Sequence, residues 1–335
     1  MITTYIGTTA GVLRLENGQA IPLGLDGERV WAIHAFPGGN GVDVVLAGSY
    51  GEGMFRSVDS GQTWASSNDG LTASAFRMIG PDPLLPGAIL AGAEPGLLFR
   101  SVDGGETWIE LSGLRALDRH EDWYLPYSPR AGAIRNVYAP VGTDARLLAS
   151  VEVGGLLDSH DGGETWSYIE VGIDDDMHHI TGHPDDGDVL FVSLGYASLR
   201  VKRGEVDGAR FGGIARSFDG GSSWQKVETD YTRATLVPPG HPDLLLAGPA
   251  PRVGEQGRIV VSSDRGDTWE PASGGIETPM EDMVELFVPA PDGSVWAICS
   301  GGRLLSAEPG EWRWTPVVPD DGSIIAQSVA FVTRE

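Results

Sequence analysis

Residues 57–64 read SVDSGQTW, and this short stretch decides the fold because it recurs along the chain. Four further copies keep Ser, Asp, Gly, Thr or Ser, and Trp in the same places: SVDGGETW at 101–108, SHDGGETW at 159–166, SFDGGSSW at 217–224 and SSDRGDTW at 262–269. A degenerate sixth copy, SAEPGEWRW, occupies 306–314, and LENGQ at 15–19 holds the matching place in a still more degenerate first copy. Self-similarity at a fixed period predicts an architecture in which each repeat is one structural unit.

The recurring residue types are those that a tight turn needs. An Asp side chain can accept backbone N–H bonds within its own turn, and Gly tolerates a positive φ. The Thr hydroxyl can join the two arms of the turn, and the Trp ring offers a large apolar face for packing between neighbouring sheets. We therefore interpret the motif as a structural hairpin clasp and look for the functional site elsewhere.

The spacing of the repeat sets the number of units. The tryptophans of successive copies are 44, 58, 58, 45 and 45 residues apart. Within a repeat, a strand ending in Pro comes first (WAIHAFP, 31–37), an apolar strand follows (VVLAG, 44–48), and two more strands flank the motif. A period of 44 or 45 residues is typical of four short strands. Two repeats carry about 13 additional residues each, and the remainder of the 335 residues accommodates seven units.

The pattern Ser-x-Asp-x-Gly-x-Thr-Trp resembles the Asp box, or bacterial neuraminidase repeat, and the similarity covers essentially the whole chain. The resemblance implies an all-β fold, a single seven-bladed β-propeller over residues 1–335 with four-stranded antiparallel blades. Residues 327–331 resemble the first strand of a blade, and residues 5–7 and 11–15 resemble the second and third. We expect about 1–28 and 323–335 to share one blade and close the ring, which removes open sheet edges.

Composition limits the partners. The net charge of −24 repels phosphate backbones and anionic lipid, which argues against nucleic-acid and membrane partners. No apolar run is long enough to span a membrane, and the N-terminus lacks the basic and apolar regions of a secretory signal. Cys299 is the single cysteine and lies in a strand-like run, so we expect a buried structural thiol. These features favour a cytoplasmic protein.

Two insertions point to one face of the ring. In propellers, the loops between blades share a face with the hairpins between second and third strands, and this is usually the ligand face, opposite the Asp boxes. Residues 114–133, entering blade four, and residues 194–211, within blade five, both map there. They form either a lid or pocket wall, or loop extensions that the fold tolerates and that have no function. The aromatic residues of the first insertion, Trp123, Tyr124 and Tyr127, favour a ligand contact because exposed aromatic side chains need a reason.

The inner strands supply the wall of the central channel. Alignment of the strands places one level at Ala32, Arg77, Arg135, His179, Ala234, Glu285 and Ser328, and the neighbouring level at Trp31, Phe76, Ile134, His178, Arg233, Val284 and Gln327. Matching hairpins direct Glu94 and Glu152 toward the same mouth, with Tyr50 in a similar place. Charged groups of this kind either converge on a ligand or form a solvated ring of structural ion pairs.

If these side chains converge on a ligand, each of them can be given a role. Glu152 or Glu94 would act as acid or base, and His179 would shuttle a proton. Arg77 and Arg135 would hold a substrate anion. The further ligand contacts that we predict are His178, Glu285, Tyr50, Trp123 and Tyr124.

A metal site is the weaker alternative. The run from Asp174 to His179 is rich in ligand types, and His183 is nearby. Adjacent residues of a strand point to opposite sides, however, so His178 and His179 cannot easily share one ion. The acidic run itself reads as a solvated loop. We therefore predict no cofactor, with a divalent metal as the alternative.

The resemblance includes several classes of function. Sialidases resemble six-bladed propellers with a Phe/Tyr-Arg-Ile-Pro signature, and FRMIGP at 76–81 is an imperfect, misplaced match, so a typical sialidase is not expected. Xyloglucan-cleaving enzymes resemble tandem propellers with catalytic Asp residues in the cleft between two domains, which one propeller cannot form. We predict a small-molecule or carbohydrate-active hydrolase or lyase with its site at the channel mouth. The alternative is a non-catalytic binding or assembly scaffold, as in sorting receptors and a photosystem assembly factor.

Overall fold

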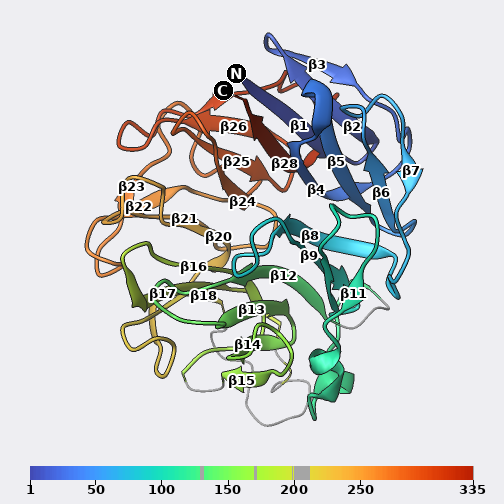
Figure 1. Cartoon of the computed structure of the whole chain (residues 1–335). Helices are drawn as coiled ribbons and strands as arrows, with labels where there is room; N and C mark the ends of the chain where they lie inside the picture. Colours follow the sequence, from blue (N-terminus) through green and yellow to red (C-terminus); the bar gives the residue numbers. More distant parts are fainter. Residues whose placement is uncertain (129–131, 170–171, 198, 200–211, 335) are drawn as a thin grey trace.

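Seven four-stranded antiparallel sheets stand around a central axis in the computed structural model (Figure 1), which confirms the predicted all-β, seven-bladed propeller. The structure describes residues 1–128, 132–169, 172–197, 199 and 212–334. Among the described residues, none of the helices has the length and apolar character that a membrane crossing needs.

Each blade starts with the strand that lines the axis. From the axis outward, blades one to four are β28 (Ala326–Thr333), β1 (Ile2–Thr8), β2 (Gly11–Glu16), β3 (Gln19–Pro22); β4 (Val30–Pro37), β5 (Asp43–Ser49), β6 (Met54–Ser57), β7 (Ala65–Ser66); β8 (Ala75–Pro81), β9 (Ile89–Glu94), β10 (Leu98–Ser101), β11 (Ile109–Glu110); β12 (Ala133–Tyr138), β13 (Leu147–Glu152), β14 (Gly155–Ser159), β15 (Ser167–Ile169). Blades five to seven are β16 (Met177–His183), β17 (Asp186–Leu194), β18 (Gly213–Ser217), β19 (Gln225–Glu228); β20 (Tyr231–Leu236), β21 (Leu245–Ala250), β22 (Val260–Ser262), β23 (Glu270–Pro271); β24 (Val284–Pro289), β25 (Val295–Cys299), β26 (Leu304–Ala307), β27 (Thr315–Pro316).

Blade one closes the ring as predicted, because the C-terminal strand β28 pairs with the N-terminal strand β1. The two chain ends therefore lie side by side (Figure 1). The buried carboxylate of Asp43 in blade two accepts a hydrogen bond of 2.6 Å from the Tyr5 hydroxyl of β1. The same carboxylate forms an ion pair with Arg334, which follows β28. Both halves of the closing blade are thus tied to the next blade.

The hydrophobic core is divided into layers between adjacent blades. One layer joins Leu90 and Leu98 of blade three to Leu147 and Leu157 of blade four. The layer after it joins other residues of blade four to blade five. Cys299 is fully buried in such a layer, as expected, and burial raises the pKa of its thiol. Stability therefore depends on each blade having neighbours on both sides.

The repeated motif forms the turn between the third and fourth strands. In blade two, Ser57 donates a 2.7 Å hydrogen bond to Asp59, and the amide of Gly61 donates to the Ser57 hydroxyl. The amide and the hydroxyl of Thr63 both donate to the Asp59 carboxylate, at 2.9 and 2.6 Å. The same bonds recur in the turns of blades three to six. The predicted clasp is thus formed, and we call these five segments the Asp turns.

The antiparallel order gives the ring two distinct faces. The innermost strands begin, and the second strands end, on what we call the front face, whereas the Asp turns lie on the opposite, back face. The first insertion contains two short 3₁₀ helices, η2 (Ser112–Ala116) and η3 (His120–Asp122), and enters blade four on the front face. Another 3₁₀ helix, η1 (Gly39–Gly41), lies in blade two. Most of the second predicted insertion lies outside the described residues.

Candidate ligand site in the central channel

Each innermost strand carries one β-bulge near its front end. The register with the second strand skips a residue there in every blade. A bulge leaves the extra residue unpaired and redirects its side chain. The seven side chains so presented belong to Trp31, Arg77, Arg135, His178, Arg233 (which shares its bulge with Ala234), Glu285 and Gln327, and all of them line the channel.

This ring of seven side chains differs from the set of channel-lining residues that the sequence alignment predicts at one level. Arg77, Arg135 and Glu285 keep their places, but the equivalent positions in the other blades are one residue earlier than predicted. Trp31, His178, Arg233 and Gln327 replace Ala32, His179, Ala234 and Ser328. The physical reason is the bulge itself, because the inserted residue breaks the alternation on which the alignment rested.

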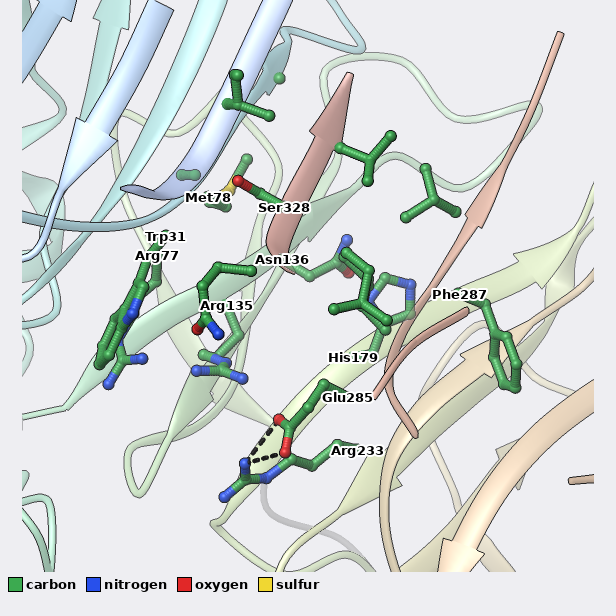
Figure 2. Close-up of a pocket in the computed structure, with 18 of the residues that line it drawn as sticks. Trp31, Arg77, Met78, Arg135, Asn136, His179, Arg233, Glu285, Phe287 and Ser328 are labelled. Carbon is green, nitrogen blue, oxygen red and sulfur yellow. Dashed lines mark hydrogen bonds and ion pairs between the residues drawn. The ribbon is translucent and has the colours of Figure 1, made fainter. Parts of the chain in front are cut away.

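The channel contains a cavity of about 740 Å³. Its back part is lined by apolar residues of the inner strands, such as Ile79, Val137 and Phe287. Its front part is polar. Figure 2 shows Arg135, Arg233 and Glu285 directed toward the same end of the channel, with Arg77 and Trp31 stacked beside them.

Arg77 is held by a glutamate of its own blade. Nη2 of Arg77 lies 2.7 Å from Oε2 of Glu94, and the guanidinium lies 3.6 Å from the ring centre of Trp31. Glu94 is fully buried and also accepts hydrogen bonds of 3.0 Å from Tyr50 and 2.5 Å from Ser128. Glu94 and Tyr50 therefore position Arg77, and neither lines the cavity as described.

Arg135 repeats this arrangement one blade further. Its Nη1 lies 3.3 Å from Oε2 of Glu152, a buried carboxylate at the end of β13. Burial opposes ionisation of Glu152, but the charge of Arg135, with more distant help from Arg233, outweighs it and lowers the pKa to about 2. Glu152 is therefore an ionised group behind the cavity wall.

The next blades continue the network. Arg233 donates two hydrogen bonds, of 2.7 and 2.6 Å, to the carboxylate of Glu285, drawn as dashed lines in Figure 2. Its Nε donates at 2.7 Å to the hydroxyl of Tyr231, which lies 3.2 Å from Nε2 of His178. Burial lowers the pKa of His178 well below its usual value and that of His179 to about 4, so both imidazoles are neutral at pH 7.

Asp176 joins this group, although the acidic run had been expected to be a solvated loop. The Asp176 side chain is 5% exposed, and its Oδ1 lies 3.6 Å from Nε2 of His178. Burial and the nearby charge of Glu152 raise the pKa of Asp176 to about 7. Asp176 and Tyr231 are the residues of this cluster that sequence reasoning missed.

A signal for Asp176 was present in the strand register. Glu94 and Glu152 lie opposite Ala75 and Ala133, two residues before the bulge. At the same place in blade five, the amide of Gly195 donates to the carbonyl of Asp176. In blades three and four the glutamate ends the second strand and an alanine stands opposite it on the innermost strand. In blade five the carboxylate, Asp176, is on the side of the innermost strand, and the small residue, Gly195, follows the second strand.

The first insertion reaches the channel through one aromatic residue only. Tyr127 lines the cavity, and its hydroxyl accepts a 3.0 Å hydrogen bond from Arg77. Trp123, predicted as an exposed ligand contact, is instead 2% exposed and packs in the layer between blades three and four, where its indole N–H donates to Tyr168. Tyr124 packs partly buried against the same layer. These rings stabilise the insertion because they bury apolar surface between blades three and four.

Comparison with known proteins supports the fold. No protein-family model matches the chain, and no curated protein matches its sequence. Among solved structures, the GH74 xyloglucanase from Xanthomonas campestris is 16% identical over 99% of this chain and 52% of its own length, with a TM-score of 0.64. The GH74 enzyme of Niastella koreensis is 15% identical over 98% and 52%, with a TM-score of 0.62. This chain thus spans about half the length of those enzymes. YCF48 bound to D1 peptide is 17% identical over 89% and 86%, with a TM-score of 0.55.

Proposed function

We propose that the central channel binds a small anionic or polyhydroxylated molecule and that the protein is a carbohydrate-active hydrolase or lyase. One observation carries this proposal. Four consecutive blades contribute Arg135, His179, Arg233 and Glu285 to the lining of one cavity. GH74 enzymes share the fold, which supports the proposal.

The exposed atoms of these side chains suit an acidic saccharide. The side chains of Arg135 and Arg233 are 18% and 20% exposed, so each can offer N–H groups to a ligand while keeping its glutamate partner. Arginine is well suited to carboxylates because two N–H groups can bind both oxygens. A sugar carboxylate bound there would have its charge neutralised, which favours removal of the neighbouring proton by a base.

His179 is a base whose side chain lines the cavity. It is only half-buried, lines the channel, and is neutral at pH 7, so it can accept a proton there. Glu285 is the other group with exposed acid–base capacity. Glu94 and Glu152, assigned to catalysis from the sequence, are revised in this proposal to positioning residues for Arg77 and Arg135.

A binding scaffold is the second candidate, and one observation favours it. The match to YCF48 bound to D1 peptide covers most of both chains, so the two are single propellers of similar size. Under this alternative the channel or its front rim would bind a peptide segment without turnover.

A thermal-shift screen with neutral sugars, uronic acids, sialic acid, small anions and unstructured peptides separates the two candidates. A ligand at about 100 times its Kd stabilises the folded state by about 2.7 kcal/mol, which shifts the melting temperature measurably. We expect a uronic acid or an oligomer of it to produce the shift. The shift should disappear in His179→Ala and Arg233→Met and persist in Arg252→Met, a control on the exposed surface.

An unchanged saccharide response in both channel variants would refute the proposed site. A response to peptides alone would favour the scaffold. Incubation of the responding saccharide with the protein, followed by chromatography of the products, then distinguishes an enzyme from a binding protein.

A further inference from the structure

Two buried carboxylates and one buried imidazole meet beside the channel. They are Glu152 of β13, and Asp176 and His178 at the start of β16. Oε2 of Glu152 and Oδ1 of Asp176 have no hydrogen-bond partner among the residues that the structure describes, although Oε2 lies 3.3 Å from Nη1 of Arg135. Buried polar atoms are nearly always paired, because an unpaired one costs about 1–3 kcal/mol. The cluster therefore offers acceptor atoms that can bind a further group.

A cation would balance the charge of this cluster. Arg135 faces Glu152, and Arg233 forms its two bonds with Glu285, so these pairs cancel. The Asp176 carboxylate remains: its two contacts within the described part of the chain are with neutral groups, and the charge of the nearby Glu152 carboxylate is negative. Oδ2 accepts the Ala197 amide at 2.9 Å, and Oδ1 faces His178.

The chain makes room for this carboxylate at a defined place. A Cβ atom on Gly195 would lie 2.1 Å from Oδ2 of Asp176 and 2.6 Å from Nε2 of His178. The equivalent residues of the two preceding blades are Glu94 and Glu152, so glycine in blade five leaves space that Asp176 fills. Two carboxylates from adjacent blades and one imidazole consequently meet.

We propose that Glu152, Asp176 and His178 form a binding site for a divalent transition-metal ion, independently of the proposed function. One ligand atom from each residue lies within 4.8 Å of the other two. The 3.6 Å between Nε2 of His178 and Oδ1 of Asp176 is close to the separation of about 3.3–3.6 Å between two tetrahedral ligands that lie about 2.0–2.2 Å from one zinc ion. All three residues lie within the described part of the chain.

The chemical types of the three side chains favour one class of metal ion. One imidazole with two carboxylates suits Zn²⁺ or Mn²⁺, whereas Ca²⁺ and Mg²⁺ prefer oxygen alone. Three protein ligands are also the number in catalytic zinc sites, which keep a fourth position open. His178 lines the channel, so that position would lie next to the cavity. The Tyr231 hydroxyl would lose its bond to His178 and keep the one from Arg233.

The test is a metal titration of the full chain. Chelator-treated protein is titrated with Zn²⁺, Mn²⁺, Ca²⁺ and Mg²⁺ by calorimetry, and the metal content after dialysis is measured by mass spectrometry. We expect about one equivalent of Zn²⁺ or Mn²⁺ per chain, with Kd below about 100 µM and weaker binding of the other two. Co²⁺ should give visible absorption bands in the folded protein.

Variants assign the binding to this cluster. Asp176→Asn and Glu152→Gln should each weaken binding at least about tenfold, and Asp185→Asn, in the exposed turn after β16, should not change it. Gly195→Ala should also weaken binding although it removes no ligand, because its Cβ displaces Asp176. Absence of Zn²⁺ and Mn²⁺ binding to the wild-type protein would overturn the proposal, whether or not the variants fold. Unchanged affinity in folded Asp176→Asn would overturn it equally.

Discussion

At the scale of single residues, the recurring aspartates act as hydrogen-bond acceptors in turns rather than as catalytic acids. In blade four, the hydroxyl and the amide of Thr165 both donate to Asp161. These bonds favour the charged carboxylate and lower its pKa to about 2, and Asp59, Asp219 and Asp264 behave alike. The motif that identifies the fold is thus remote from the channel.

Acid should weaken the turns in a defined pH range. A carboxyl group whose pKa is about 2 when folded and about 3.9 when unfolded stabilises the protein above pH 4, and this contribution is lost as the pH falls toward 2. We expect the urea midpoint to fall between pH 5 and 2.5, and to fall less in Asp161→Asn. Asp185→Asn should retain the wild-type slope. Equal slopes in all three proteins would contradict this account.

The buried pair of Arg77 and Glu94 gives a second prediction. Glu94→Gln leaves the guanidinium, which is 9% exposed, without its counter-charge, and breaking a buried pair costs about 3–5 kcal/mol. Glu110→Gln breaks a more exposed pair with Arg115 and should cost less than about 1 kcal/mol. Denaturant unfolding of both variants measures the difference, and equal losses would show that Glu94 is not a positioning residue.

At the scale of strands, the bulges and the small residues of the second strands belong together. Ser150 and Ser193 donate hydrogen bonds to the carbonyls of His178 and Arg233, the bulge residues of the next blades. Gly92 stands at the place of Ser150, and a Cβ there would lie 2.8 Å from the carbonyl oxygen of Ile134. Small residues therefore let the inner strands of blades four, five and six approach the preceding blades closely.

This close approach predicts the effect of one methyl group. Gly92→Ala would bring a Cβ within 2.6–2.8 Å of Met78 and Ile134, and such overpacking costs about 1–3 kcal/mol. Gly80→Ala in the adjacent strand meets nothing within 4 Å and should leave stability unchanged within about 1 kcal/mol. Thermal and urea unfolding test the pair. Equal stability of the two variants would mean that the strands separate easily.

The sequence predicted the elements better than the site. The Asp turns, strand order and blade closure follow from local patterns that repeat, so they could be read from the sequence. The bulges could not, because an extra residue leaves no trace in a pattern of alternation, and His178 and Arg233 were placed one level away. Asp176 was missed because its burial depends on Gly195, a residue of another strand, and Trp123 was misplaced because burial of a loop depends on what it packs against.

At the scale of the whole molecule, arginines join the blades along the back face. Arg56, Arg100, Arg146 and Arg216 each donate to a backbone carbonyl in the Asp turn of the following blade, at 2.7 to 3.0 Å. The accepting residue directly follows the turn aspartate in all four cases. With the pairing of β1 and β28, these contacts make the ring a cooperative unit.

Opening the ring should destroy that cooperativity. Removal of residues 326–335 deletes β28, exposes the edge of β1 and uncovers apolar side chains such as Ile6 and Trp296. We expect a lower melting temperature and a broadened transition by circular dichroism. Arg334→Gln, which loses only the ion pair with Asp43, should keep a sharp transition. A sharp, wild-type-like transition in the truncated protein would contradict the closure argument.

The bulges also separate the choice of channel side chain from the register of the strands. The seven positions present their side chains from equivalent backbone sites whose ladder bonds on either side involve other residues. Substitution there changes the chemistry of the channel wall while the strands keep their register. The ring thus works as an array of seven variable sites, and a library randomised at residues 31, 77, 135, 178, 233, 285 and 327, with Glu94 and Glu152 varied together with their arginine partners, could select new ligand specificities on the same fold.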